Sequence, residues 1–320
     1  MLDFNHVLST PGADVQYFEN PQQTNLLQWQ TWRKPRGAKF IYMLGVGAGA
    51  SGASGINTGV SSGGGAGGTS GAQTIVMIPA MLVPDVLYVQ CGIGGTGVAT
   101  SGSLGNAGTN TYVAIGPTNG TAIAVTDTIL YAPGGAVATA QPTASLGGTS
   151  AAGAGQVIGN MPLAARGFFF PTASGAGFAG GSSTAAGTLI TFPQLGSLVC
   201  GGAGGGGSGT TGGAGGAIIF TIAGSNGTEF AVSAQPGGIA AVTSTPAGRG
   251  VDGTKSRYAM FYYGGTGGGG STNTAGGIGG AGGNGAPGCG GGGGGGATTT
   301  NTTIAPGGNG GGGFVYIITT

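Results

Sequence analysis

The sequence carries very little charge. Eight Lys and Arg against seven Asp and Glu leave a formal net charge of +1 over 320 residues. A chain of this kind has no overall field that would attract nucleic acid or an acidic membrane surface, so neither is expected as a partner. Disorder is not expected either, because the charge is too low to keep a chain soluble by repulsion and hydrophobic residues make up 39% of the chain. So few charges suit a rigid protein that sits within an assembly.

Residues that catalyse reactions or bind metals are equally scarce. The only histidine is His6, and the three cysteines, Cys91, Cys200 and Cys289, lie far apart. The carboxylates occur singly, at Asp3, Asp14, Glu19, Asp85, Asp127, Glu229 and Asp252. Residues 47–52 match the G-x-G-x-x-G pattern, but the residues after them cannot form the helix that a dinucleotide site requires. We therefore predict a protein that is not an enzyme and binds no cofactor or metal.

Helical and membrane patterns are missing as well. Apolar residues do not recur with a 3.6-residue period, so little helix is expected. The first residues, MLDFNHVLST, lack the positive and then apolar regions of a secretory signal. The long uncharged stretches consist of Gly, Ser and Thr and not of Leu-type residues, so no membrane insertion is expected.

Glycine is what the chain has in abundance, with 82 residues. The densest stretch runs from Gly276 to Gly296, and every third position from Gly276 through Gly294 is glycine. This period fits a polyproline II type helix, which has three residues per turn. One edge of that helix would then consist only of glycine and would allow another backbone to approach closely. The predicted edge residues are Gly276, Gly279, Gly282, Gly285 and Gly288.

Apolar runs flank the glycine tracts in four strand–tract–strand units. Their residues are β-branched and aromatic, as is typical of short strands. The runs lie at residues 39–44, 74–78, 86–91, 111–115, 198–200, 217–222, 258–263 and 314–318, with further runs at 129–131 and 167–171. The run at 314–318 is apolar at successive positions, which fits a strand covered on both faces. We predict an all-β fold, with a short-strand β-sandwich or jelly-roll-like body and glycine-rich polyproline II type tracts.

Composition divides the chain into four parts. We expect an N-terminal attachment segment at 1–36, a first glycine-rich β module at 37–135, a linker at 136–166 and a second module at 167–320. A single body with interleaved strands is the alternative, because sequence does not show which strands pair.

Two polar or aromatic clusters are candidate contact sites. The first comprises Trp29, Trp32, Arg33, Lys34 and Arg36, whose residue types are enriched at protein interfaces. These residues either attach the protein to an assembly or cap the core of the following domain. The second cluster is the charged stretch at 249–257, which contains Arg249, Asp252 and Lys255. It is either a solvated connection or a ligand-contacting loop.

These features together resemble the glycine-rich structural proteins of bacteriophages, which include tail-fibre and tail-tip adhesins. The resemblance covers about residues 30–320 and rests on the entry Trp32-Arg-Lys-Pro35, the GVGAGASG that follows a strand, the repeated units and the terminal GGNGGGGFVYI. It implies a packed array of polyproline II type helices whose loops at one end contact the host. Carried over to this chain, contacts would come from residues 249–257, 271–275 or 297–304. The Thr-rich, non-aromatic sequence of the last stretch departs from the adhesins and keeps a head-fibre or decoration role open.

The expectation is a non-enzymatic virion protein at the particle surface, in a tail fibre or tail tip that contacts the host surface. Capsid decoration or a head fibre is the first alternative, and a matrix-like glycine-rich structural protein is the second. Expected partners are other virion proteins, bound through the N-terminal segment, and a host cell-surface receptor. A homo-oligomer, such as the trimer common among phage fibres, is also expected.

Overall fold

The structure is a computed structural model that describes most of the chain. The described residues are 13–20, 27–57, 61–117, 127–139, 141–143, 147–148, 168–172, 177–191, 207–208, 212–219, 235–241, 246–254, 262, 264–272, 278–298 and 304–320. No helix in this part is long and apolar enough to cross a membrane.

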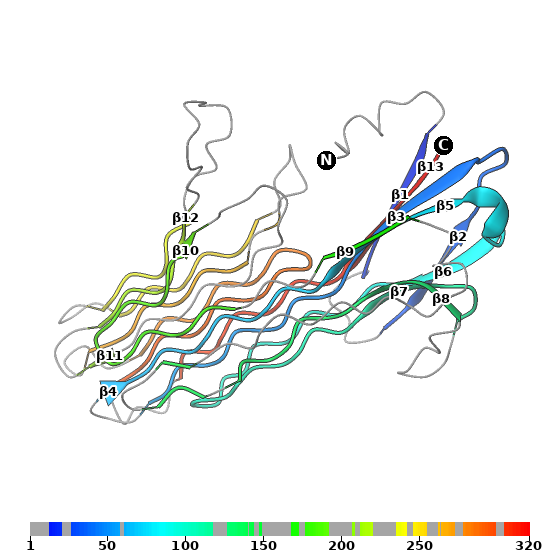
Figure 1. Cartoon of the computed structure of the whole chain (residues 1–320). Coiled ribbons are helices and arrows are strands. Elements are labelled where there is room, and N and C mark those ends of the chain that lie inside the picture. Colours follow the sequence, from blue (N-terminus) through cyan, green and yellow to red (C-terminus); the bar gives the residue numbers. More distant parts are fainter. Residues whose placement is uncertain are drawn as a thin grey trace, which may run out of the picture.

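Short strands and glycine tracts account for nearly all of the described chain (Figure 1). The strands are β1 Asp14–Glu19, β2 Trp29–Arg33, β3 Phe40–Val46, β4 Ser61–Ser62, β5 Gln73–Pro79, β6 Val86–Gln90, β7 Thr111–Ala114, β8 Thr128–Ala132, β9 Phe168–Thr172, β10 Ile190–Thr191, β11 Gly207–Ser208, β12 Ile218–Ile219 and β13 Phe314–Thr319. A single turn of 3₁₀ helix, η1, spans Ala80–Leu82. The predictions of an all-β fold and of little helix are confirmed.

Two antiparallel sheets form the body. One sheet has five strands in the order β1-β13-β3-β5-β9, and the other has four in the order β2-β6-β7-β8. Alternate side chains of both sheets point into one shared core, as the two-residue period of a strand requires. That core contains Trp32, Ile41, Met43, Val76, Ile78, Leu87, Val89, Val113, Leu130, Val315 and Ile317. The body is therefore a β-sandwich.

The five-stranded sheet is also covered on its outer face. Leu44, Val46 and Phe314 point away from the sandwich core and pack with Tyr262 and Cys289 into a second buried cluster. Phe314 contacts the ring of Tyr262, with centroids 4.9 Å apart. The tract that contains Cys289 thus seals this face, which explains why β13 is apolar at successive positions.

Strands from all of the expected modules share one sheet. β13, from the second expected module, pairs with β3 of the first, and its other edge pairs with β1 of the expected attachment segment. The interleaved single body, which the sequence left as the alternative, is thus the arrangement of the described strands. Residues 136–166, expected as a linker, contribute to the array where they are described: Gly63 N donates to Thr143 O at 3.0 Å, and Gly148 N donates to Gly64 O at 3.0 Å.

The glycine tracts continue directly from the strands and run side by side to form an array (Figure 1). The 47–56 tract follows β3, the 63–72 tract leads into β5, and the 304–313 tract leads into β13. The three tracts are neighbours in the same order as their strands, through bonds such as Ala53 N to Ala66 O at 2.8 Å and Gly52 N to Gly308 O at 2.9 Å. The order of the strands β13, β3 and β5 in the sheet is therefore also the order of their tracts in the array. The end of the array remote from the sandwich is called the distal end below.

Hydrogen bonding in the array has a period of three. Successive backbone N–H groups of the 47–56 tract donate in turn to the 63–72 tract, to residues 103–109 and to the 304–313 tract, and then the sequence repeats. A helix with three residues per turn presents its N–H groups in three directions, so this pattern is that of a polyproline II type helix. Each tract bonds to its neighbours instead of to itself.

The tract at residues 288–297, called the central tract, is surrounded by others. Every residue of it is buried. Its backbone exchanges hydrogen bonds with the 47–56, 63–72 and 304–313 tracts and with those at 264–272 and 278–285. Seven consecutive glycines fill its middle, from Gly290 to Gly296. A Cβ added at any of these seven positions would overlap a backbone oxygen of a neighbouring segment, so this part of the tract accepts no side chain.

Candidate functional site

Three of the described residues of the predicted glycine edge face neighbouring backbone. A methyl group placed on Gly279, Gly282 or Gly285 would overlap the carbonyl oxygen of Gly295, Gly292 or Cys289, respectively. These positions therefore accept no side chain unless the backbone moves. Gly276 lies outside the described residues.

Gly288, predicted as part of that edge, is required for a different reason. Its φ is +75°, and an added Cβ would lie 2.5 Å from Cγ1 of Val46. A positive φ is costly for residues other than glycine. Gly288 thus ends the outer tract and turns the chain into the central tract.

The 278–285 tract has a second glycine edge that sequence reasoning missed. A Cβ on Gly280 or Gly283 would overlap the carbonyl oxygen of Gly248 or Val251, on another neighbour. Only the third position of each turn points outward, and Ile278 there is 40% exposed. The signal was present in the sequence as glycine pairs separated by one other residue, GGI-GGA-GGN.

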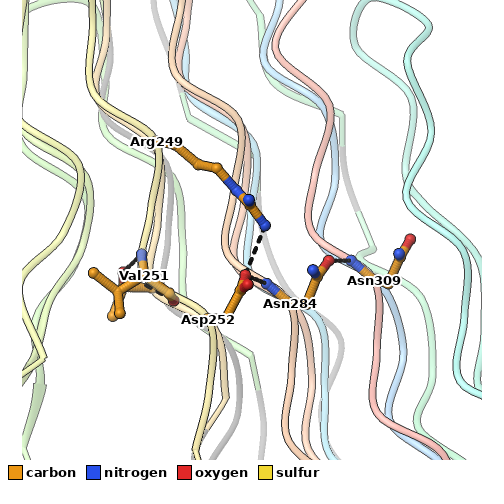
Figure 2. Close-up of polar contacts among 6 residues, drawn as sticks. Arg249, Val251, Asp252, Asn284 and Asn309 are labelled. Carbon is orange, nitrogen blue, oxygen red and sulfur yellow. Dashed lines mark hydrogen bonds and ion pairs between the residues drawn. The ribbon is translucent and has the colours of Figure 1, made fainter.

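The charged stretch at 249–257 is a tract on the side of the array, where it is described. Asp252 pairs with Arg249 at 2.7 Å, and both side chains are about half exposed. The same Asp252 oxygen accepts a hydrogen bond from the backbone N–H of Asn284 on the adjacent tract, at 2.7 Å (Figure 2). Arg249 and Asp252 therefore belong to the scaffold and not to a connecting loop. Lys255 lies outside the described residues.

Asparagines extend this contact across the surface. Asn284 Oδ1 accepts from Asn309 N at 3.0 Å (Figure 2), and Asn309 Oδ1 accepts from Gly97 N at 2.7 Å. Side-chain oxygens thus satisfy backbone N–H groups of the next tract along an outer layer, where a buried tract would use a carbonyl. We call Asp252, Asn284 and Asn309 the side-chain ladder.

The residues of the expected attachment cluster do not form one surface in the structure. Trp32 is completely buried in the sandwich core, so it is not available to a partner. Alternation along β2 places Trp32 inward and Trp29 on the opposite face, where Trp29 is half-buried. The burial supports, for Trp32, the alternative that it caps the core.

The basic members of that cluster lie at the end of the sandwich opposite the array. Lys34 Nζ donates to the carbonyl oxygens of Val83 and Ala80, at 2.7 and 3.2 Å, and pairs with Asp85 at 2.9 Å. Lys34 therefore fastens the β2–β3 turn to the β5–β6 connection. Arg33 and Arg36 are exposed.

Tract ends meet at the distal end and include residues 271–272 and 297–298 of the other two stretches that the resemblance implies as contact residues, all of which are buried. Ser62 Oγ donates to Ala297 O, and Thr298 N donates to Ser271 Oγ at 3.4 Å. The ends of the 264–272 and 288–297 tracts thus lie together there. The continuations, at 273–277 and 299–303, lie outside the described residues.

Partly buried tyrosines and the buried Cys91 of the body favour their neutral forms. Burial raises the pKa of the Cys91 thiol to about 12 and that of Tyr42 to about 12. Burial, assisted by the hydrogen bond to Glu19, raises the pKa of Tyr17 above its ordinary value. A thiol with a raised pKa is a poor nucleophile. No three His, Cys, Asp or Glu residues in the described ranges lie close enough together to hold a metal ion.

Comparison with known proteins gives one result for this architecture. No curated protein matches the sequence. The sequence model of the glycine-rich domain family matches residues 24–196. These residues include the four-stranded sheet and the tracts at 47–56 and 63–72. The match covers more than half of the 320 residues. The chain therefore belongs to the glycine-rich domain family.

Proposed function

We propose that the protein is a non-enzymatic structural component of a bacteriophage virion. In this proposal it is exposed at the particle surface as part of a tail fibre or tail tip and contacts the host surface. The observation that supports the proposal most is the array itself, in which backbone-to-backbone contacts build a stiff rod with two unlike ends. A rod of this kind can hold a contact surface away from the body of a particle.

The two ends differ in what they offer. The distal end presents exposed short polar residues such as Thr100 and Ser101, whose Oγ accepts from Asn57 N, while Ser271, Thr272 and Thr298 at the tract ends there are buried. Loops held by a rigid scaffold are where recognition residues are commonly found. The sandwich end carries four of the eight basic residues, all within residues 33–39. In the proposal the distal end meets the host and the sandwich end joins the particle.

Hydrogen exchange of the protein in intact particles, compared with the free protein, tests this assignment. A fibre or tip component should gain protection at the sandwich end alone, over residues 29–39 and 79–86. A capsid decoration protein would instead gain protection along the tracts, as neighbouring subunits cover them. Protection of the exposed distal residues 99–101 by the particle would overturn the proposed orientation.

Host contact needs its own measurement. Fluorescent full-length protein should bind susceptible cells and fail to bind resistant ones. A variant with residues 299–303 replaced by glycine and serine should lose binding while keeping its melting temperature. Equal binding by the two proteins would contradict a role for these connections. Sedimentation velocity of the free protein tests the homo-oligomer that we propose in addition.

A further inference from the structure

A hollow of ≈ 400 Å³ lies at the sandwich end of the molecule. It is formed where the turn between β2 and β3 meets the η1 connection between β5 and β6. Its lining includes Arg33, Pro35, Arg36, Met81, Asp85 and Val86. We call it the end pocket. Its volume is enough for one or two side chains of another protein and lies within the ~300–1,000 Å³ range of ligand pockets.

The walls of the end pocket are held in place before anything binds. The Lys34 contacts described above join its two walls, and the backbone N–H of Lys34 also donates to Asp85 O at 2.9 Å. The turn that carries Arg36 is closed by Ala38 N donating to Pro35 O at 3.4 Å. Gly37 supplies the φ of +83° that this turn needs. A preformed wall loses less entropy when a ligand binds.

Positive charge at the end pocket is not neutralised. The ion pair to Asp85 balances Lys34. Arg33, Arg36 and Lys39 are exposed and form no ion pair with any residue in the described part of the chain. Two uncompensated cations, Arg33 and Arg36, therefore line the pocket, although the chain as a whole has a net charge of only +1. Exposed arginines favour carboxylates in particular, because the guanidinium can bind both oxygens.

An apolar side chain stands beside these cations. Met81, in η1, lines the pocket and is 88% exposed. An exposed Met next to Arg matches the residue types that are enriched at protein interfaces. A small anion such as phosphate would leave the Met81 side chain uncovered, whereas a polypeptide would cover it.

We propose that the end pocket binds an acidic segment of a partner protein. Carboxylates of that segment pair with Arg33 and Arg36, and an apolar residue beside them packs on Met81. The identity of the partner as a virion protein rests on the proposed function, but the chemistry of recognition does not. The pocket replaces Trp32 as the attachment point, since Trp32 is buried in the core.

Binding of a fluorescent glutamate- and leucine-containing peptide to the full-length protein tests the proposal by anisotropy. The wild-type protein should bind this peptide and not a matched peptide with lysine in place of glutamate. Combined Arg33→Glu and Arg36→Glu should weaken binding at least ~10-fold, because two charge-assisted contacts become repulsive. Met81→Asp should weaken it too. Arg249→Glu, on the side of the array, is the matched control and should bind as the wild type does.

Several outcomes would overturn the proposal. Equal affinity of the Arg33→Gln, Arg36→Gln double variant and the wild type would do so, provided that both have the same melting temperature. Inorganic phosphate or a nucleic acid could be added at the same concentration of negative charge as the peptide. If either displaced the peptide, the pocket would be a general anion site and not a peptide site. Peptide binding without particle protection at the sandwich end would refute the virion assignment and leave this inference standing. Normal assembly of the double variant into particles would refute this inference alone.

Discussion

The sandwich and the array bury their backbones in opposite ways. In the sandwich, large side chains such as Trp32 and Met43 fill the space between sheets, and the backbones of neighbouring strands bond to each other within each sheet. In the array, as around Gly292, no side chain separates the tracts and the backbone bonds outward in three directions. The sandwich loses stability when atoms are removed, and the array loses it when atoms are added.

This difference explains how the fold can be stable with few charged residues and with no disulfide in the described part of the chain. Cys91 and Cys289 are both buried and form no disulfide within the described part of the chain. Hydrophobic burial contributes roughly 25 cal/mol per Å² in the sandwich. The array has little apolar area, and its order comes from the cost of leaving buried N–H and C=O groups unpaired. Four predictions test the contrast.

The largest effect is expected for a side chain added to the central tract. A Cβ at Gly292 would overlap the carbonyl oxygen of Thr266, and Gly292 N also donates to Gly283 O at 2.8 Å. Gly292→Val should therefore destabilise by well over the ~1–3 kcal/mol usual for overpacking, or prevent folding. Gly285→Val should be nearly as severe.

Thermal unfolding followed by circular dichroism measures these variants. The control is Ala281→Val, on the outward position of the 278–285 tract, which should cost little. Equal melting temperatures for Ala281→Val and Gly285→Val would contradict close packing of the tracts.

Removing atoms from the sandwich is expected to have the next largest effect. Trp32 is completely buried between the sheets, so Trp32→Ala should cost about 3–5 kcal/mol through the cavity it leaves. Urea unfolding gives the value. The matched change in the array, Ala281→Gly, should cost less than about 1 kcal/mol, because only one methyl group is removed. Similar losses for the two variants would remove the distinction between the regions.

Alkali should weaken the sandwich through its tyrosines. Burial raises the pKa of Tyr42 from 10.0 to about 12, so its contribution is complete below pH 10 and is lost as the pH rises to about 12. The unfolded chain releases the proton first, and stability therefore falls with pH. Tyr42→Phe should remove about 1 kcal/mol of this loss at pH 11, discounted for partial exposure. If the urea midpoint fell by the same amount between pH 8 and pH 11 in the wild type and in Tyr42→Phe, this role of Tyr42 would be excluded.

The side-chain ladder should give the smallest effects. Asn284→Ala removes the acceptor for the Asn309 N–H and should cost about 0.5–1.5 kcal/mol. Arg249→Ala breaks an ion pair between half-exposed groups and should cost less than about 1 kcal/mol. A double-mutant cycle of Asn284→Ala with Asn309→Ala measures whether neighbouring members cooperate. Additive losses would show that each residue acts only on its own tract.

Much of the fold could be predicted from local sequence. Most of the longer strands lie at predicted apolar runs, because β-branched and aromatic residues suit a pleated, buried surface. β1 was missed, since DVQYFE is half polar and its pairing with β13 is a tertiary contact. Apolar runs at 198–200 and 258–261 lie outside the described residues.

Tract neighbours could not be predicted. The residues from Gly290 to Gly296 are identical, so no side chain distinguishes one register from another. The strands that continue into the tracts fix the register instead, as β3 does for the 47–56 tract. The roles of Asp252 and Trp32 also depend on pairing. Whether an Asp faces solvent or a neighbouring N–H, and whether a Trp faces a partner or a core, follows from elements distant in sequence.

Amide hydrogen exchange in the central tract tests the account most directly. Gly291 N donates to Ala50 O at 3.0 Å, and Gly294 N donates to Ala53 O at 2.9 Å. Both groups are buried, so we predict that they exchange only with global unfolding, as slowly as the N–H of Met43 in β3. Exchange of Gly291 and Gly294 at the rate of a free glycine peptide, with Met43 still protected, would contradict a packed array.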